Sequence, residues 1–356
     1  MKKETQKTLI LSGDDVNAIV DKFGLNKLMD RLISDLTKAI ESFDPQHTKI
    51  PIRDGFNYKG ENPGLVEWMP LHQKGKEITI KVVGYHPRNP ETHLLPTILS
   101  TISSYDTTTG HLKGLVDGVL LTALRTGATS AIASTYLADP KSKILGLIGC
   151  GAQAVTQLHA ISRVFDLNLI LINDIDSETM ESFKNRCEML DINAEIRQAS
   201  LLEIVKESDI VCTSTSIEVG EGPLFENIDV NSKIHINAVG SDFPGKTELP
   251  LSLLKESIVV PDFLNQALVE GECQQLETSD IGPDLIDVIQ NKESKLDPFN
   301  QKTVFDSTGW ALEDQVVMNL FLELAEKFNV GTELEIENTS EDAKNPYHFM
   351  LKAVQV

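Results

Sequence analysis

Residues 144–154 read Ile-Leu-Gly-Leu-Ile-Gly-Cys-Gly-Ala-Gln-Ala, a short apolar run that leads into a glycine-rich turn. A phosphate-binding turn needs glycine where the backbone bends sharply and where it approaches a pyrophosphate, and the following helix offers N–H donors. Gly149 and Gly151 stand at those two positions, and Ala154 stands at the third. The pattern is weak evidence alone, but here it lies between a predicted strand and a predicted helix, which is the required context. The stretch therefore predicts a dinucleotide site that includes Gly149, Gly151, Ala152 and Gln153.

Asp174 closes the next apolar run, Leu-Ile-Leu-Ile-Asn-Asp (169–174), 25 residues after Gly149. An acid at the end of the second strand of such a unit accepts hydrogen bonds from the adenosine ribose, and it would repel a 2′-phosphate. We therefore expect NAD rather than NADP, with Asp176 as the reserve candidate for this contact. A β-turn followed by an acidic helix N-cap is the alternative interpretation of the same residues.

Thr213 and Ser214 follow the apolar run 209–212, at what should be the carboxyl end of a parallel strand. Ligands of open α/β sheets bind at that edge. Their hydroxyls either face the cofactor or cap the next element, and the sequence leaves both interpretations open.

Short apolar runs alternate with helical stretches through the second half of the chain. Strands are predicted at residues 144–149, 169–174, 194–197, 209–214, 234–240, 257–262 and 303–306. Strands separated by helices imply βαβ units and a parallel sheet covered on both faces. The sequence predicts an α/β fold, with a Rossmann-like doubly wound parallel-sheet domain at residues 127–317.

The first part of the chain has a different texture. It is expected to open with helix, because Ser-Gly-Asp-Asp (12–15) reads as a capping box and apolar residues then recur at helical spacing up to Ile40. Residues 50–117 read as turn-separated extended pieces, and 120–137 as a long helix. A helix predicted at 310–328 returns the chain to this part, so we predict a discontinuous α+β domain from residues 1–126 and 318–356.

The composition limits the possible partners. The 356 residues include 32 Lys+Arg against 53 Asp+Glu, a net charge of −21, so nucleic acid and anionic membranes are not expected. The first apolar stretch, Thr8 to Leu11, is too short for a signal sequence, and no run approaches the ~20 residues that span a bilayer. The 4 cysteines form no CxxC pair. These features are typical of a reduced, cytoplasmic protein, and no metal site is expected.

Three charged residues stand in apolar surroundings, where charge is costly. They are Glu67 in Leu-Val-Glu-Trp-Met, Lys81 in Ile-Thr-Ile-Lys-Val-Val and Arg125 in Ala-Leu-Arg-Thr-Gly. A solvated face explains any one of them alone. Together they indicate an amino-acid pocket, in which the cations bind a carboxylate and the acid binds an amine.

Asp242 lies in the segment Asn-Ala-Val-Gly-Ser-Asp-Phe-Pro-Gly-Lys-Thr-Glu-Leu (237–249), after a buried-looking strand. Placed beside a nicotinamide, this carboxylate could act as a general base. The alternative is an ordinary turn aspartate in a Pro-Gly loop.

The sequence resembles the ornithine cyclodeaminase and mu-crystallin family. The resemblance is carried by Leu-Thr-Ala-Leu-Arg-Thr-Gly-Ala-Thr-Ser (121–130), residues 148–154, residues 237–249 and Val-Phe-Asp-Ser-Thr-Gly-Trp-Ala-Leu-Glu-Asp (304–314), in the family's order. Within the family, residues 66–70, 81–90, 95–99 and 270–276 look like the true cyclodeaminases, and most like those that act on lysine. The archaeal alanine dehydrogenases and the ketimine reductases look more distant.

The resemblance implies roles for particular residues. Arg53, Lys81 and Arg125 would hold the substrate carboxylate, Glu67 an amine, and Asp242 would transfer protons with Asn237 beside it. Thr129 and Ser130 would touch the cofactor. The family's fold also implies a homodimer formed through the discontinuous first domain, which would bind substrate as well.

The resemblance further implies a redox-neutral reaction: hydride leaves Cα to NAD⁺, the side-chain amine attacks the resulting imine, ammonia departs, and the hydride returns. Tethering makes the ring closure intramolecular. The expected conversion is L-lysine to L-pipecolate and ammonia, with L-ornithine to L-proline as a possible further or main activity. Lysine and ornithine both stay open as substrates, because one methylene adds only ~1–3 kcal/mol of discrimination in an apolar pocket. A ketimine reductase, an amino-acid dehydrogenase and a non-enzymatic dinucleotide-regulated binding protein are the alternatives that the resemblance leaves open.

Overall fold

The second half of the chain forms a seven-stranded sheet in which every pair of neighbouring strands is parallel. The computed structural model describes residues 6–60, 62–290, 296–337 and 340–352. The strand order is β10-β9-β8-β11-β12-β14-β13. The strands are β8 (Ile144–Ile148), β9 (Leu169–Asn173), β10 (Glu195–Gln198), β11 (Ile210–Thr213), β12 (His235–Ala238), β13 (Ser257–Pro261) and β14 (Lys302–Asp306). The predicted doubly wound sheet is therefore confirmed.

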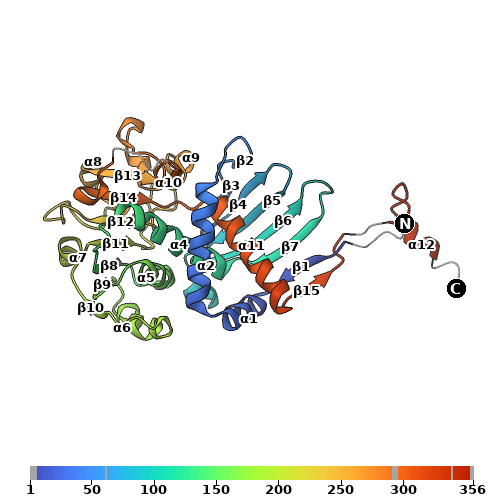
Figure 1. Ribbon diagram of the computed structural model, residues 1–356, viewed down its shortest axis with the longest axis horizontal. Helices are drawn as coiled ribbons and strands as arrows, with labels where there is room; N and C mark the ends of the chain where they lie inside the picture. Colours follow the sequence, from blue (N-terminus) through green and yellow to red (C-terminus); the bar gives the residue numbers. More distant parts are fainter. Residues whose placement is uncertain (1–5, 61, 291–295, 338–339, 353–356) are drawn as a thin grey trace.

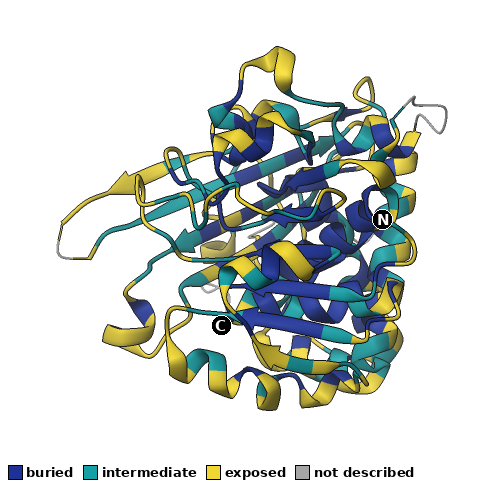
Figure 2. Ribbon diagram, turned by 90° about the vertical axis from the view of Figure 1, so that its left-hand side faces the viewer, coloured by how far each residue is buried: buried dark blue, intermediate teal, exposed yellow. Residues whose placement is uncertain are grey.

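Helices connect these strands and cover the sheet (Figures 1 and 2). They are α5 (Ala152–Val164), α6 (Ser177–Arg186), α7 (Leu201–Glu207), α8 (Leu251–Lys255), α9 (Leu264–Ala267) and α10 (Leu285–Gln290), with short 3₁₀ turns at Glu188–Leu190, Glu272–Gln275, Thr278–Asp280 and Pro298–Asn300. The central strands β11 and β12 are buried at every position, which explains their continuous apolar character. Their carboxyl ends meet at one edge of the sheet, and this edge carries the candidate site.

The first part of the chain builds a mixed eight-stranded sheet, ordered β15-β1-β7-β6-β5-β4-β2, with β3 also paired to β4. Its strands are β1 (Thr8–Leu11), β2 (Thr48–Lys49), β3 (Asp54–Tyr58), β4 (Gly64–Gln73), β5 (Glu77–Tyr85), β6 (Ile98–Asp106), β7 (Leu112–Asp117) and β15 (Thr332–Leu334). Helices α1 (Gly13–Phe23), α2 (Leu25–Glu41) and α11 (Ala311–Phe328) lie on one face of this sheet (Figure 1). The remaining helices are α3 (Asn89–His93), α4 (Val119–Leu137) and α12 (His348–Lys352).

The chain does not open with helix, contrary to the expectation from sequence. The predicted capping box at Ser12 and Asp15 is present, but strand β1 precedes it and pairs in parallel with β7. Thr8–Leu11 gives little sequence signal, because four residues are too few to establish a period of two.

Helix α4 joins the two sheets. It is buried along almost its whole length and packs against α2, α5, α11 and strand β12. Helix α11 packs against β4 and β5, so it returns the chain to the first sheet. The predicted domain boundaries near residues 126 and 317 fall inside α4 and α11, respectively, and they remain a prediction. The outermost ends of the predicted first domain, residues 1–5 and 353–356, lie outside the described residues. Among the described helices, none is long and apolar enough to cross a membrane.

Candidate active site

The glycine turn lies where the strand order of the parallel sheet reverses, between β8 and β11. Gly149 has a φ of +89°, and a Cβ there would lie 2.7 Å from the carbonyl oxygen of Ser214. Gly151 is the N-cap of α5, has no side-chain cap, and would accept a Cβ with no atom within 4 Å. The turn thus presents uncapped N–H groups next to open space, which is the geometry that a pyrophosphate requires.

Asp174 lies directly against this turn. Its carboxylate accepts a hydrogen bond of 2.6 Å from the Cys150 N–H and one of 2.9 Å from the Asp176 N–H. Asp176 itself is the N-cap of α6, where it accepts a hydrogen bond from the Glu178 N–H. The helix-capping interpretation thus describes Asp176. Asp174 lies beside the glycine turn, and its contact with a ribose remains a prediction.

The predicted cofactor hydroxyls fall into two groups. Thr129 and Thr213 are engaged within the protein, with the carbonyl oxygen of Arg125 at 2.9 Å and the carboxylate of Glu248 at 2.5 Å, respectively. The hydroxyls of Ser130 and Ser214, in contrast, are buried and have no hydrogen-bond partner among the described residues. Buried polar groups are almost always paired. The two unpaired hydroxyls and the open turn at Gly151 therefore fit a bound dinucleotide.

The last two predicted cofactor contacts, Ala152 and Gln153, lie in the first turn of α5. The Gln153 amide donates to the Thr156 hydroxyl at 3.1 Å. Ala152 directly follows Gly151, so both residues lie beside the glycine turn.

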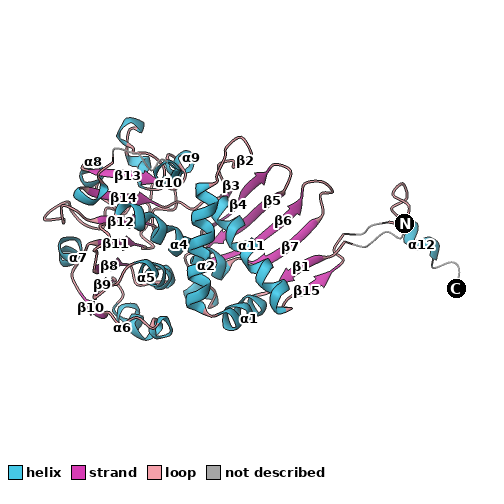
Figure 3. Cartoon of the chain, in the orientation of Figure 1, coloured by secondary structure: helices cyan, strands magenta, loops and turns pink. Residues whose placement is uncertain are grey.

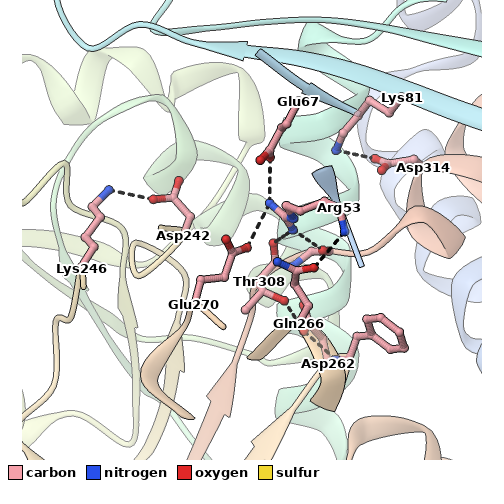
Figure 4. Close-up of polar contacts among 12 residues, drawn as sticks. Arg53, Glu67, Lys81, Asp242, Lys246, Asp262, Gln266, Glu270, Thr308 and Asp314 are labelled. Carbon is pink, nitrogen blue, oxygen red and sulfur yellow. Dashed lines mark hydrogen bonds and ion pairs between the residues drawn. The ribbon is translucent and has the colours of Figure 1, made fainter. Parts of the chain in front are cut away.

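Arg53 occupies the centre of a second cluster of charges (Figure 4). Its Nη1 lies 3.1 Å from carboxylate oxygens of both Glu67 and Glu270, and its Nη2 donates at 2.6 Å to the carbonyl oxygens of Thr308 and Gly309. Glu67 projects from β4 and Glu270 from the loop before the 3₁₀ turn Glu272–Gln275. Burial raises the pKa of Glu270 to about 8, and the Arg53 guanidinium opposes that rise.

Lys81 and Arg125 form the adjoining part of this cluster. Lys81 projects from β5 and donates to Asp314 at 2.9 Å; Arg125, on α4, donates to Glu313 at 2.7 Å. Burial and the neighbouring Arg125 lower the pKa of Lys81 to about 8. Burial would also lower the pKa of Arg125, but Asp314 and Glu313 raise it, so Arg125 stays charged. The structure therefore brings Arg53, Lys81 and Arg125 together as predicted.

Asp242 lies across the site from Arg53, in the loop after β12 (Figure 4). Its carboxylate pairs with Lys246 at 2.8 Å, and the Lys246 ammonium also lies 5.6 Å from the centre of the Tyr85 ring. Asn237 is fully buried within β12, where its amide donates to the Ser134 hydroxyl at 3.0 Å. The role of Asn237 at the substrate remains a prediction.

Sequence reasoning missed most of the carboxylates in this site. Glu270, Asp262, Glu313 and Asp314 were not predicted. Asp262 accepts hydrogen bonds from Thr308 and Gly309, the residues whose carbonyl oxygens bind Arg53. Three of the four lie within segments 270–276 and 304–314, which carry the family resemblance, so a search for acids within those motifs could have found them.

A parallel doubly wound sheet with an open glycine turn at its switch point, joined to a pocket of buried cations and carboxylates, defines a dinucleotide-binding α/β enzyme. The chain belongs to the ornithine cyclodeaminase/mu-crystallin family, whose model matches residues 15–328. It is 40% identical to the L-lysine cyclodeaminase of Streptomyces rapamycinicus over 342 residues, which cover 96% of this chain and 99% of that protein.

Solved structures agree with this assignment. A lysine cyclodeaminase structure that describes the recognition of L-lysine, L-ornithine and L-2,4-diaminobutyric acid superposes with a TM-score of 0.92 at 44% identity, covering 96% of this chain and 99% of that one. An archaeal alanine dehydrogenase dimer with bound NAD superposes with a TM-score of 0.82 at 30% identity, covering 93% of this chain and all (100%) of that one.

Proposed function

We propose that this protein is an NAD-dependent cyclodeaminase that converts L-lysine to L-pipecolate and ammonia, and that also accepts L-ornithine to give L-proline. The observation that carries the proposal is the pocket in which three cations, Arg53, Lys81 and Arg125, are paired with four carboxylates. A diamino acid has one carboxylate and two amines, so it needs both kinds of partner. The 40% identity to an L-lysine cyclodeaminase supports the same substrate.

Each charged residue has a role in this proposal. Arg53, Lys81 and Arg125 hold the substrate carboxylate, and Glu67 holds an amine. The three cations are already paired with protein carboxylates, among them Glu313 and Asp314, so a buried positive charge is never left uncompensated when the substrate is absent. A substrate carboxylate would join this network.

The bound NAD would supply a hydride acceptor at the substrate Cα and would return the same hydride to the cyclic imine, so no net oxidation occurs. The glycine turn, Asp174 and the unpaired Ser130 and Ser214 hydroxyls would bind it. Asp242 would accept a proton from the side-chain ammonium so that its nitrogen can attack the α-imine, and would then give that proton to the departing ammonia. The nitrogen is tethered to the carbon that it attacks, so ring closure needs no bimolecular encounter.

The experiment that tests the function is product analysis. Purified protein with catalytic NAD should turn L-lysine into pipecolate and one equivalent of ammonia, with no added reductant. Pipecolate that appears only with stoichiometric NADH and a supplied cyclic imine would replace the proposal by a ketimine reductase. Parallel turnover of L-ornithine decides whether ornithine is the main substrate.

The variant Asp242→Asn tests the proton carrier. It should keep NAD affinity within about twofold and lose turnover by at least ~10²-fold, because general acid–base catalysis contributes on this order. Full activity in this variant would contradict the role of Asp242.

An amino-acid dehydrogenase of the same family is the second candidate, because the superposed archaeal alanine dehydrogenase shares the fold at 30% identity. It would form NADH from alanine in stoichiometric amount, whereas a cyclodeaminase accumulates none. A dinucleotide-regulated binding protein would bind NAD and release no ammonia from any diamino acid.

We also propose that the protein is a homodimer in a reducing, cytoplasmic setting. The outer face of the first sheet, opposite α2 and α11, exposes apolar side chains such as Val82 and Leu99. The four cysteines are all buried and free, which suits a reducing compartment.

A further inference from the structure

The Glu248 carboxylate is fully buried. It lies outside the Arg53 cluster, six residues beyond Asp242. Oε1 accepts hydrogen bonds from the Thr215 N–H at 2.8 Å and the Thr215 hydroxyl at 2.7 Å. Oε2 accepts from the Thr213 hydroxyl at 2.5 Å and the Gly240 N–H at 2.9 Å. Four donors therefore converge on one carboxylate.

These donors come from two different loops. Thr213 and Thr215 flank Ser214, the predicted cofactor residue with the unpaired hydroxyl, at the end of β11. Gly240 follows β12 and starts the loop that carries Asp242. One side chain thus fixes the cofactor loop and the loop of the proposed proton carrier relative to each other.

The approach of Glu248 to the second loop is very close. A Cβ on Gly240 would lie 2.2 Å from Oε1 of Glu248, so any larger residue would displace the carboxylate. Gly240 does not have a positive φ, so its backbone conformation does not require glycine. The close approach of the Glu248 carboxylate explains why this position has no side chain.

A second buried carboxylate extends the connection. Glu272 accepts hydrogen bonds from the N–H groups of Glu248 and Leu249, at 2.7 and 3.2 Å. The Glu272 N–H in turn donates to Asp306, at the end of β14, at 2.8 Å. Glu270, which pairs with Arg53, lies two residues before Glu272. The network therefore runs from the cofactor loop to the edge of the substrate pocket.

We propose that Glu248 is a positioning residue that couples the cofactor loop Thr213–Thr215 to the Asp242 loop, so that Asp242 is correctly placed only when both loops are bound to the same carboxylate. The proposal rests on the proposed function for its catalytic part. All four hydrogen bonds that the Glu248 carboxylate accepts come from these two loops, so it acts by holding the loops. A carboxylate suits this task because it accepts four hydrogen bonds and donates none.

The test is Glu248→Gln, which keeps the size of the side chain but puts a donor where an acceptor was. In either orientation of the amide, its NH₂ group points at the backbone N–H of Thr215 or at that of Gly240. A backbone N–H can only donate, so one hydrogen bond is lost in both orientations. We expect the variant to remain folded, to bind NAD at least tenfold more weakly in a fluorescence titration, and to lose kcat for lysine at least tenfold.

The loss should also have a signature that reduced stability alone would not give. Because a displaced Asp242 delays ring closure after the hydride has left Cα, Glu248→Gln should accumulate NADH absorbance at 340 nm during turnover, whereas the wild type should not. The matched control is Glu256→Gln, an exposed glutamate at the end of α8, which should leave all three measurements unchanged.

Gly240→Ala reaches the same contact from the other loop and should reproduce the weakened NAD binding and the NADH signal, even if Glu248→Gln does not fold. A Glu248→Gln variant with a lower Tm but NAD affinity and kcat within twofold of wild type would overturn the proposal, since Glu248 would then be a structural residue only. If the wild type binds NAD but cyclises no diamino acid, the proposed function is wrong. The NAD affinities of Glu248→Gln and Gly240→Ala, compared with that of the wild type, then still test whether Glu248 couples the two loops. A wild type that binds no NAD overturns both.

Discussion

At the scale of single residues, burial shifts the pKa of one cation of the site, Lys81, and that of one carboxylic acid, Glu270, in opposite directions. Lys81 is 1% exposed, and its pKa is lowered to about 8 because burial and Arg125 both disfavour the charged ammonium. Burial also disfavours the charged form of Glu270, which is the carboxylate, and it therefore raises the pKa of Glu270 to about 8. Both groups therefore change their protonation state over one narrow pH range.

This coincidence predicts a pH dependence. As the pH rises through about 8, Lys81 loses its positive charge and Glu270 gains a negative one, and both changes weaken the binding of a substrate carboxylate. We expect kcat/KM for lysine to fall above pH 8, approaching about a tenfold loss per pH unit for each group. A pH–rate profile in constant ionic strength measures this.

The variant Lys81→Arg separates the two groups, since a guanidinium keeps its charge throughout this range. It should move part of the fall to higher pH, while Lys113→Arg, at a half-exposed lysine of β7, should leave the profile unchanged. A wild-type kcat/KM that stays level up to pH 9.5 would exclude this account.

The same residues show how far the sequence could predict the site. Lys81 and Arg125 stood out because a charge inside an apolar run is costly, and the structure places both in the pocket. Their partners Glu313 and Asp314 begin helix α11, where acids are expected for an ordinary reason, the helix dipole. Sequence pattern alone could not distinguish an acid that stabilises a helix end from one that neutralises a buried cation.

At the scale of elements, the turn between β8 and α5 was predictable because local and global signals agree there. The strand, the glycines and the helix are consecutive in sequence, so the required context could be recognised. Strand β1 was missed because its partner β7 is about a hundred residues away, and a four-residue strand has no local signal strong enough to replace that information.

The two glycines of this turn should respond differently to the same substitution. Gly149→Ala places a Cβ at a φ of +89° and 2.7 Å from the Ser214 carbonyl oxygen, so it should destabilise the fold by about 2 kcal/mol. That corresponds to a fall in Tm of about 3 °C for a chain of this size. Gly151→Ala has open space and a φ of −71°, and should leave Tm unchanged.

Gly151→Ala should nevertheless bind NAD at least tenfold more weakly, because its methyl group would fill the space where the pyrophosphate approaches the backbone. Thermal unfolding and NAD titration of the two variants check both parts. An NAD affinity of Gly151→Ala equal to that of the wild type would mean that the dinucleotide does not lie on this turn.

At the scale of the whole molecule, α1, α2 and α11 cover one face of the first sheet (Figures 1 and 3). The other face of this sheet carries exposed apolar side chains, here called the apolar stripe. Phe56, on β3, contacts Trp68 of β4 with ring centres 5.7 Å apart, and Trp68 lies opposite Val82 of β5. Leu99 of β6 lies on the same face, opposite Gly84. Exposed fractions of 70% for Phe56, 40% for Val82 and 39% for Leu99 leave this stripe open to solvent. An exposed apolar surface of this kind typically marks an interface.

We expect a second copy of the chain to cover this stripe, since the two-fold symmetry of most homodimers brings the same surface of both subunits together. The double variant Val82→Asp with Leu99→Asp places two charges per subunit in the interface, and like charges would then meet across the two-fold axis. It should sediment as a monomer of about half the wild-type mass in analytical ultracentrifugation. The matched control is Leu202→Asp, at a 53% exposed leucine on α7 of the other sheet, which should sediment as the wild type does. A wild type that is monomeric at micromolar concentration, or a double variant that still dimerises, would show that this face is not where two subunits meet.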